Sequence, residues 1–166
     1  MSSASPSGSS PASPRALPPF WSLVEAHGDE LLAHARRMSD AQSAEDVLQD
    51  ALLRALRAYP RLRHADHLRA WLYRVTTTTA LDMHRSRRRE VLTEDPPMPA
   101  VEAEYDDGAF ESLIAPLAPT ARDALRLRFV DDLDYDRIAA ALDCSPEAAR
   151  QRVSTAVRTL RERVTA

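Results

Sequence analysis

The sequence contains no lysine, one cysteine, three glycines and few aromatic residues, and each scarcity excludes a class of protein. The single cysteine, Cys144, excludes an internal disulfide, and no group of cysteines and histidines has the spacing of a zinc site. We therefore predict no metal ion and no cofactor. An aromatic content of 5% favours helices over strands. No apolar run reaches the roughly 20 residues that span a bilayer, so we predict no membrane-spanning helix.

The first 18 residues are mostly Ser, Pro, Ala and Gly, and Arg15 is their single charge. They lack the basic start and apolar stretch of a secretory signal, so we expect a cytoplasmic protein without membrane insertion. They are also too polar and too interrupted by proline to form a core. We expect residues 1–18 to be a disordered tail.

The charges are distributed unevenly along the chain. All 22 basic residues are arginine, whose planar guanidinium suits phosphates and guanine edges, although a GC-rich genome would favour the same codons. The net charge is -3, but residues 94–111 carry seven acids and no base, which leaves a net charge of +4 on the remainder. The overall acidity therefore does not exclude a nucleic acid partner.

Apolar residues at helical spacing predict three helices in the first half, over residues 20–38, 44–58 and 67–85. A Ser-x-x-Asp pattern that begins at Ser43 is typical of a capping box, and Pro60 ends the second of these helices. The third contains the β-branched run Thr76–Thr79, which costs about 2 kcal/mol of helix propensity relative to Ala. Packing or a ligand must compensate for that cost.

The same spacing predicts three helices in the second half, over residues 120–130, 135–142 and 146–164. A capping-box pattern begins the first at Thr120, and Ser145 with Pro146 begins the third. A short helix, a three-residue turn and a basic second helix form a helix-turn-helix. We therefore predict an all-α protein of two small helical domains joined by a flexible acidic linker, the second a helix-turn-helix. The predicted boundaries are 1–18 for the tail, 19–90 and 115–166 for the domains, and 91–114 for the linker.

The last predicted helix has an apolar face and a polar face. At 100° per residue, its apolar residues share one arc, and its Arg, Gln, Ser and Thr residues lie outside that arc. These are the side chains that contact base edges and phosphates in the major groove. An ordinary amphipathic helix with solvated arginines is the alternative. The predicted duplex-contacting residues are Ser145, Glu147, Arg150, Gln151, Arg152, Ser154, Thr155 and Arg158.

Two stretches of the chain resemble the same family. The second half is similar to region four of the extracytoplasmic-function (ECF) group of sigma-70-type factors in the stretch Tyr135-Asp-Arg-Ile-Ala-Ala-Ala-Leu-Asp-Cys-Ser-Pro-Glu-Ala-Ala-Arg-Gln-Arg-Val. The first half resembles the family's polymerase-binding helix in Ala44-Glu-Asp-Val-Leu-Gln-Asp-Ala-Leu-Leu-Arg-Ala-Leu and its promoter-melting helix in Arg69-Ala-Trp-Leu-Tyr-Arg-Val. Together the matches cover roughly residues 20–90 and 115–164.

The resemblance implies a sigma factor that binds core RNA polymerase and promoter DNA, both as duplex and as melted single strand. Region four would contact the minus-thirty-five element through the duplex-contacting residues above. The loop before the third helix, and that helix, would hold the melted minus-ten strand. The residues implied for the minus-ten strand are Arg61, Arg63, His64, His67, Trp71, Arg74, Thr77, Thr78, Arg85 and Arg88.

The resemblance also implies a polymerase-binding face on the second helix. Its residues are Asp46, Gln49, Asp50, Leu53 and Arg54. A solvated face with pairing between Asp50 and Arg54 is the alternative. Trp71 shares the apolar stripe of Leu68 and Val75, so it also suits the core. The resemblance also implies an anti-sigma factor as a possible further partner.

The chain departs from the family at three positions. Thr78 stands where the family commonly has Asn, and Thr155 and Val157 stand where its recognition helix commonly carries Arg. Fewer fixed charges predict weaker or more selective promoter contacts. The alternative function is a stand-alone helix-turn-helix regulator. We predict no enzymatic activity, because no nucleophile, base and orienting group form a motif.

Overall fold

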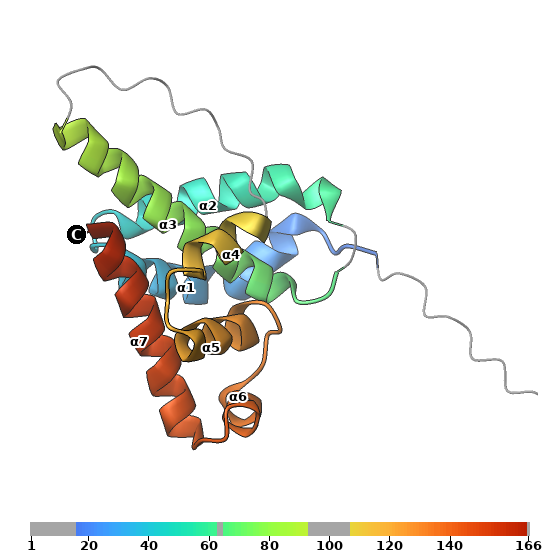
Figure 1. The fold of residues 1–166 in the computed structure, drawn as a ribbon. Helices are drawn as coiled ribbons and strands as arrows, with labels where there is room; N and C mark the ends of the chain where they lie inside the picture. Colours follow the sequence, from blue (N-terminus) through green and yellow to red (C-terminus); the bar gives the residue numbers. More distant parts are fainter. Residues whose placement is uncertain (1–15, 63–64, 93–106, 166) are drawn as a thin grey trace, which may run out of the picture.

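A computed structural model describes residues 16–62, 65–92 and 107–165, and its secondary structure over these ranges is entirely helical (Figure 1). This agrees with the predicted all-α class. The helices are α1 (Phe20–Met38), α2 (Ala44–Ala58), the short 3-10 helix η1 (Tyr59–Arg61), α3 (Leu68–Leu92), α4 (Asp107–Ile114), α5 (Pro119–Phe129), α6 (Tyr135–Ala141) and α7 (Pro146–Thr165). Within the described ranges, no helix combines the length and apolar character that crossing a membrane requires. The predicted tail lies outside the described residues, apart from 16–18.

The structure differs from the predicted linker at both of its ends. Helix α3 continues to Leu92, and α4 begins at Asp107, so only the middle of the range 91–114 lies outside the described residues. Helix α4 forms because Phe110 and Ile114 are four residues apart and are both buried, with Leu117 close behind them. The acidic residues around them hid this apolar spacing. On the exposed side of α4, Arg126 of α5 donates to Glu111 and lowers the pKa of its carboxyl.

Two of the three predicted caps do not form. The Ser43 side chain caps no backbone group, because its backbone is already helical and the Asp40 Oδ1 accepts its N–H at 2.8 Å. Thr120 lies inside α5, which begins with Pro119 in its first turn. Ser145 does cap α7, since its Oγ accepts the N–H of Ala148 at 3.1 Å. Helix α6 has a similar cap from Asp134, which was not predicted.

The two halves share one hydrophobic core. Helices α1, α2 and α3 pack together. Helix α7 lies against α1 and α3, and α5 lies against α3, whereas α6 packs against α5 and α7 (Figure 1). Leu31, Leu72 and Leu81 of the first half belong to the same buried cluster as Leu125 and Leu160 of the second. The predicted domains are therefore docked on each other.

Phe129, the last residue of α5, is at the centre of the contact between the halves. Its ring centroid lies 5.5 Å from that of His34 and 5.6 Å from that of Tyr73. Its carbonyl accepts a hydrogen bond from Arg74 Nη1 at 2.6 Å. Nearby, Arg69 donates to Glu30 of α1 at 2.7 Å and contacts Asp132 of the second half at 3.3 Å. Aromatic stacking and charged hydrogen bonds thus hold the docked arrangement together.

The threonine run is compensated by packing. All four side chains of Thr76–Thr79 are buried in the middle of α3. The hydroxyls of Thr76, Thr77 and Thr78 donate to the carbonyls four residues earlier, at 2.8 to 2.9 Å. These hydrogen bonds satisfy three buried hydroxyls, and burial of the methyl groups offsets the propensity cost.

His34 is a fully buried neutral histidine. The hydroxyl proton of Thr77 is donated to the backbone carbonyl of Tyr73, so Thr77 Oγ1 can only accept a hydrogen bond from His34. His34 Nε2 lies 2.8 Å from this oxygen and must therefore carry the proton of the neutral ring. Burial, together with the charge of Arg37, lowers the pKa of His34 from 6.5 to about 3. The folded chain therefore excludes a proton that the unfolded chain binds below pH 6.5.

We expect acid to destabilise the fold through His34. As pH falls below the unfolded pKa of 6.5, His34 is protonated only in the unfolded state, so the free energy of unfolding decreases. The loss between pH 7 and pH 5 from this group is about 2 kcal/mol. Chemical denaturation of His34→Gln at both pH values should show a smaller decrease than wild type. Arg36→Gln, an exposed change on the same helix, is the control, and an equal pH dependence in wild type and His34→Gln would contradict the prediction.

Candidate nucleic-acid interface

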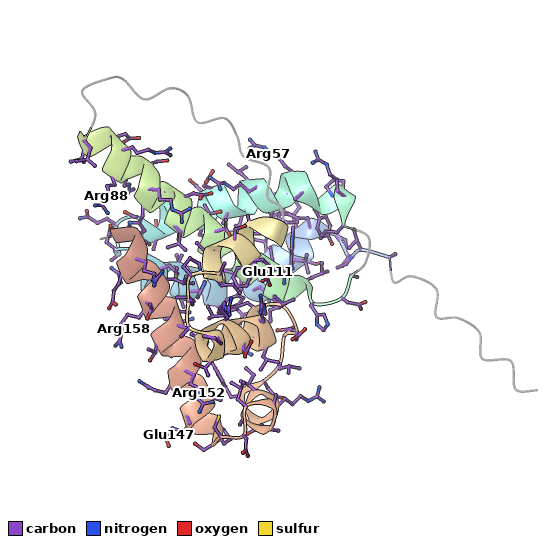
Figure 2. The ribbon with its side chains drawn as sticks, in the orientation of Figure 1. Arg57, Arg88, Glu111, Glu147, Arg152 and Arg158 are labelled. Carbon is purple, nitrogen blue, oxygen red and sulfur yellow. The ribbon has the colours of Figure 1, made fainter. Side chains whose placement is uncertain are left out.

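The predicted duplex-contacting residues of α7 lie on its exposed side. Thr155 is half-buried, and the others are exposed. On the opposite side Ala149, Val153 and Leu160 are buried, where α7 packs against α5, α6, α3 and α1. Figure 2 shows Glu147, Arg152 and Arg158 following one another along α7. Docking of the two halves therefore leaves the polar face of this helix open to solvent.

A tight turn sets the direction of α7 relative to α6. Asp143 has a φ of 48°, in the left-handed region that Asp tolerates better than most residues. The N–H of Cys144 donates to the carbonyl of Ala139, which closes the end of α6. Ser145 then caps α7, and Glu147 in its first turn complements the positive end of the helix dipole. These contacts give the turn its defined geometry.

The arginines of the α7 face have different restraints. The Arg150 guanidinium carbon lies 5.0 Å from the centroid of the Tyr135 ring. Arg152 Nη1 donates to the carbonyl of Leu142 at a long 3.4 Å. Arg158 Nε is 3.6 Å from Glu162 Oε1, in an ion pair whose two side chains are both exposed. An exposed pair of this kind contributes little and is easily exchanged for a phosphate.

The residues predicted for the melted strand are not brought to one surface. Arg61, His67, Arg85 and Arg88 are exposed, and Figure 2 shows Arg88 near the end of α3 that carries Leu92. Arg63 and His64 lie outside the described residues. His67 has a φ of 59°, and its carbonyl accepts the N–H of Trp71 at the start of α3.

Four of these predicted strand contacts are used inside the protein. Trp71, Thr77 and Thr78 are buried, so in this arrangement they cannot touch DNA. Trp71 packs in the core near Tyr59. A core position was the alternative to DNA contact that the apolar stripe on α3 indicated for Trp71. Arg74 is half-buried and donates to Phe129. The arrangement of the halves, which the sequence did not reveal, accounts for the position of Arg74.

The predicted polymerase-binding face of α2 is partly open. Asp46, Gln49 and Leu53 are exposed, the last with 50% of its surface accessible. Leu56, one turn further on and 41% accessible, extends this face and was missed. The three-residue spacing from Leu53 on a polar helix surface was the signal for it. Two exposed leucines beside carboxylates form a mixed apolar and acidic surface.

Arg54 makes a contact between helices that its sequence pattern does not predict. Its Nε lies 3.0 Å from Asp50 Oδ2, and its Nη1 donates to Asp82 of α3 at 2.8 Å. The guanidinium therefore crosslinks α2 to α3. Only the pair with Asp50 was foreseeable from the spacing of four residues.

Comparisons with known proteins agree over both halves. The family model "Sigma-70 region 2" matches residues 23–90, and "Sigma-70, region 4" matches residues 107–160. The chain is 42% identical over 74 residues to the ECF RNA polymerase sigma factor SigG of Mycobacterium tuberculosis. That alignment covers 44% of this chain and 20% of SigG, so the chain spans about a fifth of the length of this relative.

Two further similarities extend over most of the chain. The RNA polymerase sigma-E factor of Streptomyces coelicolor is 30% identical over 153 residues, which cover 89% of this chain and 86% of that protein. A solved structure of the sigma factor RpoE from Bartonella quintana, in complex with the anti-sigma factor NepR, aligns over 87% of this chain and 95% of its own. Its TM-score is 0.47 and its sequence identity is 25%.

We expect the exposed face of α7 to bind duplex DNA through its arginines. Replacing Arg152 by Ala removes one phosphate contact, so binding should weaken and the slope of log K against log salt should decrease in magnitude by about 1. Fluorescence anisotropy with a labelled duplex at several salt concentrations measures both quantities. Arg36→Ala removes an exposed arginine from α1 and should leave the slope unchanged. Equal slopes for Arg152→Ala and wild type would contradict the assignment of this face.

Proposed function

Because the chain belongs to the ECF group of the sigma-70 family, we propose that it binds core RNA polymerase and directs promoter recognition, promoter melting and transcription initiation. The observation that carries this proposal is the presence of both regions in family order, over residues 23–90 and 107–160. A stand-alone helix-turn-helix regulator would leave the first match without a role. The proposed work is binding, and it needs no covalent chemistry.

The open face of α7 supports contact with the minus-thirty-five element. Arg can bind the O6 and N7 of guanine through two hydrogen bonds, and Gln can bind adenine in the same way. Arg150 and Gln151 lie near the start of α7, the part of a recognition helix that reaches base edges. Ser154 and Arg158 lie further along and suit phosphates. We propose that the other predicted residues of this face support these contacts.

The first half supports contact with the melted minus-ten strand through its exposed basic residues. Arg61, Arg85 and Arg88 provide charge for a single-stranded backbone, and His67 adds an exposed imidazole ring. Arg74 could join them only if its hydrogen bond to Phe129 breaks. Trp71, Thr77 and Thr78 would act from the core, by holding α3 in place.

The two halves must separate for this function. The minus-ten and minus-thirty-five elements are about 25 base pairs apart, or about 85 Å at 3.4 Å per base pair. Helix α3 has 25 residues and is about 38 Å long, and α7 packs directly against it. A docked chain therefore cannot reach both elements. We propose that binding to polymerase separates α5 and α7 from α1 and α3, which also releases Arg74.

Transcription in vitro with core polymerase on a promoter library tests the proposed function. We expect transcripts from a defined subset of promoters. The double variant Leu53→Ala, Leu56→Ala should reduce affinity for core polymerase by about tenfold, because two half-exposed leucines lose contact area.

The matched control for the α2 face is Leu92→Ala, an exposed leucine at the end of α3, which should bind core polymerase as wild type does. Thermal unfolding should not change in any of these variants, since the replaced side chains are exposed. Absence of transcripts with active core polymerase would refute the function. Normal core binding by the double variant would refute only the α2 face.

Separation of the halves predicts a change in energy transfer between two fluorophores. In a Cys144→Ser background, Ala41→Cys and Ala140→Cys place labels on exposed sites of the two halves. Transfer should be efficient in the free chain and should fall when core polymerase and promoter are added. Labels at Ala26→Cys and Glu90→Cys, both in the first half, should report no change. Unchanged transfer across the halves in an active complex would contradict the separation.

A further inference from the structure

The ring of Tyr135 lies between the helices of the helix-turn-helix and contacts two arginines. Tyr135 is the first residue of α6, and its side chain packs against buried residues of both hydrophobic clusters. The guanidinium carbon of Arg128, from α5, is 4.9 Å from the ring centroid, and that of Arg150, from α7, is 5.0 Å away. One aromatic ring therefore connects α5, α6 and α7.

The two arginines differ in what else holds them. Arg128 is half-buried, and its Nη1 donates to the carbonyl of Leu133 at 2.9 Å. Arg150 is exposed on the face of α7 that was assigned to DNA. The contact with Tyr135 is thus an internal one for Arg128 and a contact at the edge of the DNA-binding face for Arg150.

A guanidinium near the face of an aromatic ring is attracted by the ring's quadrupole. The ring of Tyr135 can attract both guanidinium groups, although Arg128 is also held by the carbonyl of Leu133. A free arginine side chain occupies many rotamers, and a base contact requires one of them. A ring that already restricts the side chain reduces the entropy lost when the base contact forms.

We infer that Tyr135 is a positioning and specificity-determining residue, whose ring holds the Arg150 guanidinium in place to contact a base edge in the major groove. This inference rests on the proposed function for its DNA readout. The tyrosine itself touches no DNA. Its hydroxyl is not required, because the interaction belongs to the ring face.

The test is a double-mutant cycle in the complex with core polymerase. Wild type, Tyr135→Leu, Arg150→Ala and the double variant are compared on a matched promoter and on promoters changed at single minus-thirty-five positions. Tyr135→Leu should reduce discrimination by about two- to fivefold at the position that Arg150→Ala also affects. In the Arg150→Ala background the same change should have no further effect. Tyr135→Phe should behave as wild type.

A second measurement does not depend on transcription. A guanidinium beside an aromatic ring has its Nε–H proton resonance shifted upfield by the ring current, so the Arg150 signal of the free chain should be shifted. Tyr135→Leu should abolish the shift, and Tyr135→Phe should retain it. If Tyr135→Leu fails to fold in a thermal scan, Tyr135→Met replaces it as a variant with a long, flexible side chain and no ring.

Three results would overturn the inference. An equal loss of discrimination in the wild-type and Arg150→Ala backgrounds would give Tyr135 a purely structural role. A loss in Tyr135→Phe would mean that the hydroxyl contacts DNA. An unshifted Arg150 signal in wild type would mean that the ring does not hold the guanidinium. By contrast, a chain that shows the ring-current shift but supports no transcription would refute the proposed function and leave the positioning of Arg150 intact.

Discussion

The arrangement of the molecule depends on the burial of Phe129 between the two halves. Helix α5 ends with this ring, and only the first half supplies His34 and Tyr73 as stacking partners for it. Phe110 of α4 covers it from a third direction. Burial of a phenylalanine ring contributes about 4 kcal/mol. That is a large part of the free energy of unfolding of a small helical domain. The docked arrangement is therefore favoured until a partner covers the apolar surface around Phe129 instead of the first half.

The same contact involves groups that are suited to DNA. Arg74 is engaged by the carbonyl of Phe129, and Arg69 is engaged by Glu30 and Asp132. Burial raises the pKa of the Glu30 carboxyl, but hydrogen bonds from Arg69 and His27 outweigh it and hold that pKa below its usual value. These are charged hydrogen bonds at a partly solvated edge. Breaking these hydrogen bonds costs little free energy, because water or a partner can replace them. A partner then shifts the equilibrium towards the separated form if it binds that form better than the docked form.

Helix α7 does not depend on this arrangement for its DNA-binding face. Ala149 and Val153 are buried where α7 packs against α5 and α6 of the second half. The opposite side of α7 therefore faces solvent whether or not the two halves are docked. Separation of the halves would expose new surface on α3 and on α5. It would leave the positions of Arg150 and Gln151 on α7 unchanged.

The bounds of α1, α2, α6 and α7 could be predicted within about one residue, because helical periodicity is a property of neighbouring residues. The polar face of α7 and the two family motifs follow from the same local pattern. The missed tertiary contacts join residues far apart in the chain, whereas α4 and the cap from Asp134 are local features that were also missed. The missed tertiary contacts include that of Arg54 with Asp82, the position of Tyr135 beside Arg150, and the engagement of Arg74 by Phe129.

The sequence by itself therefore determined helices α1, α2, α3, α5, α6 and α7, the polar face of α7 and the family, since each is carried by residues close together in the chain. Only the tertiary structure decided which of the predicted contact residues are available. Trp71, Thr77 and Thr78 are in the core and Arg152 is exposed, although all four are residue types that DNA-binding surfaces use. The reason is that burial depends on what packs against a helix, and that partner lies elsewhere in the chain.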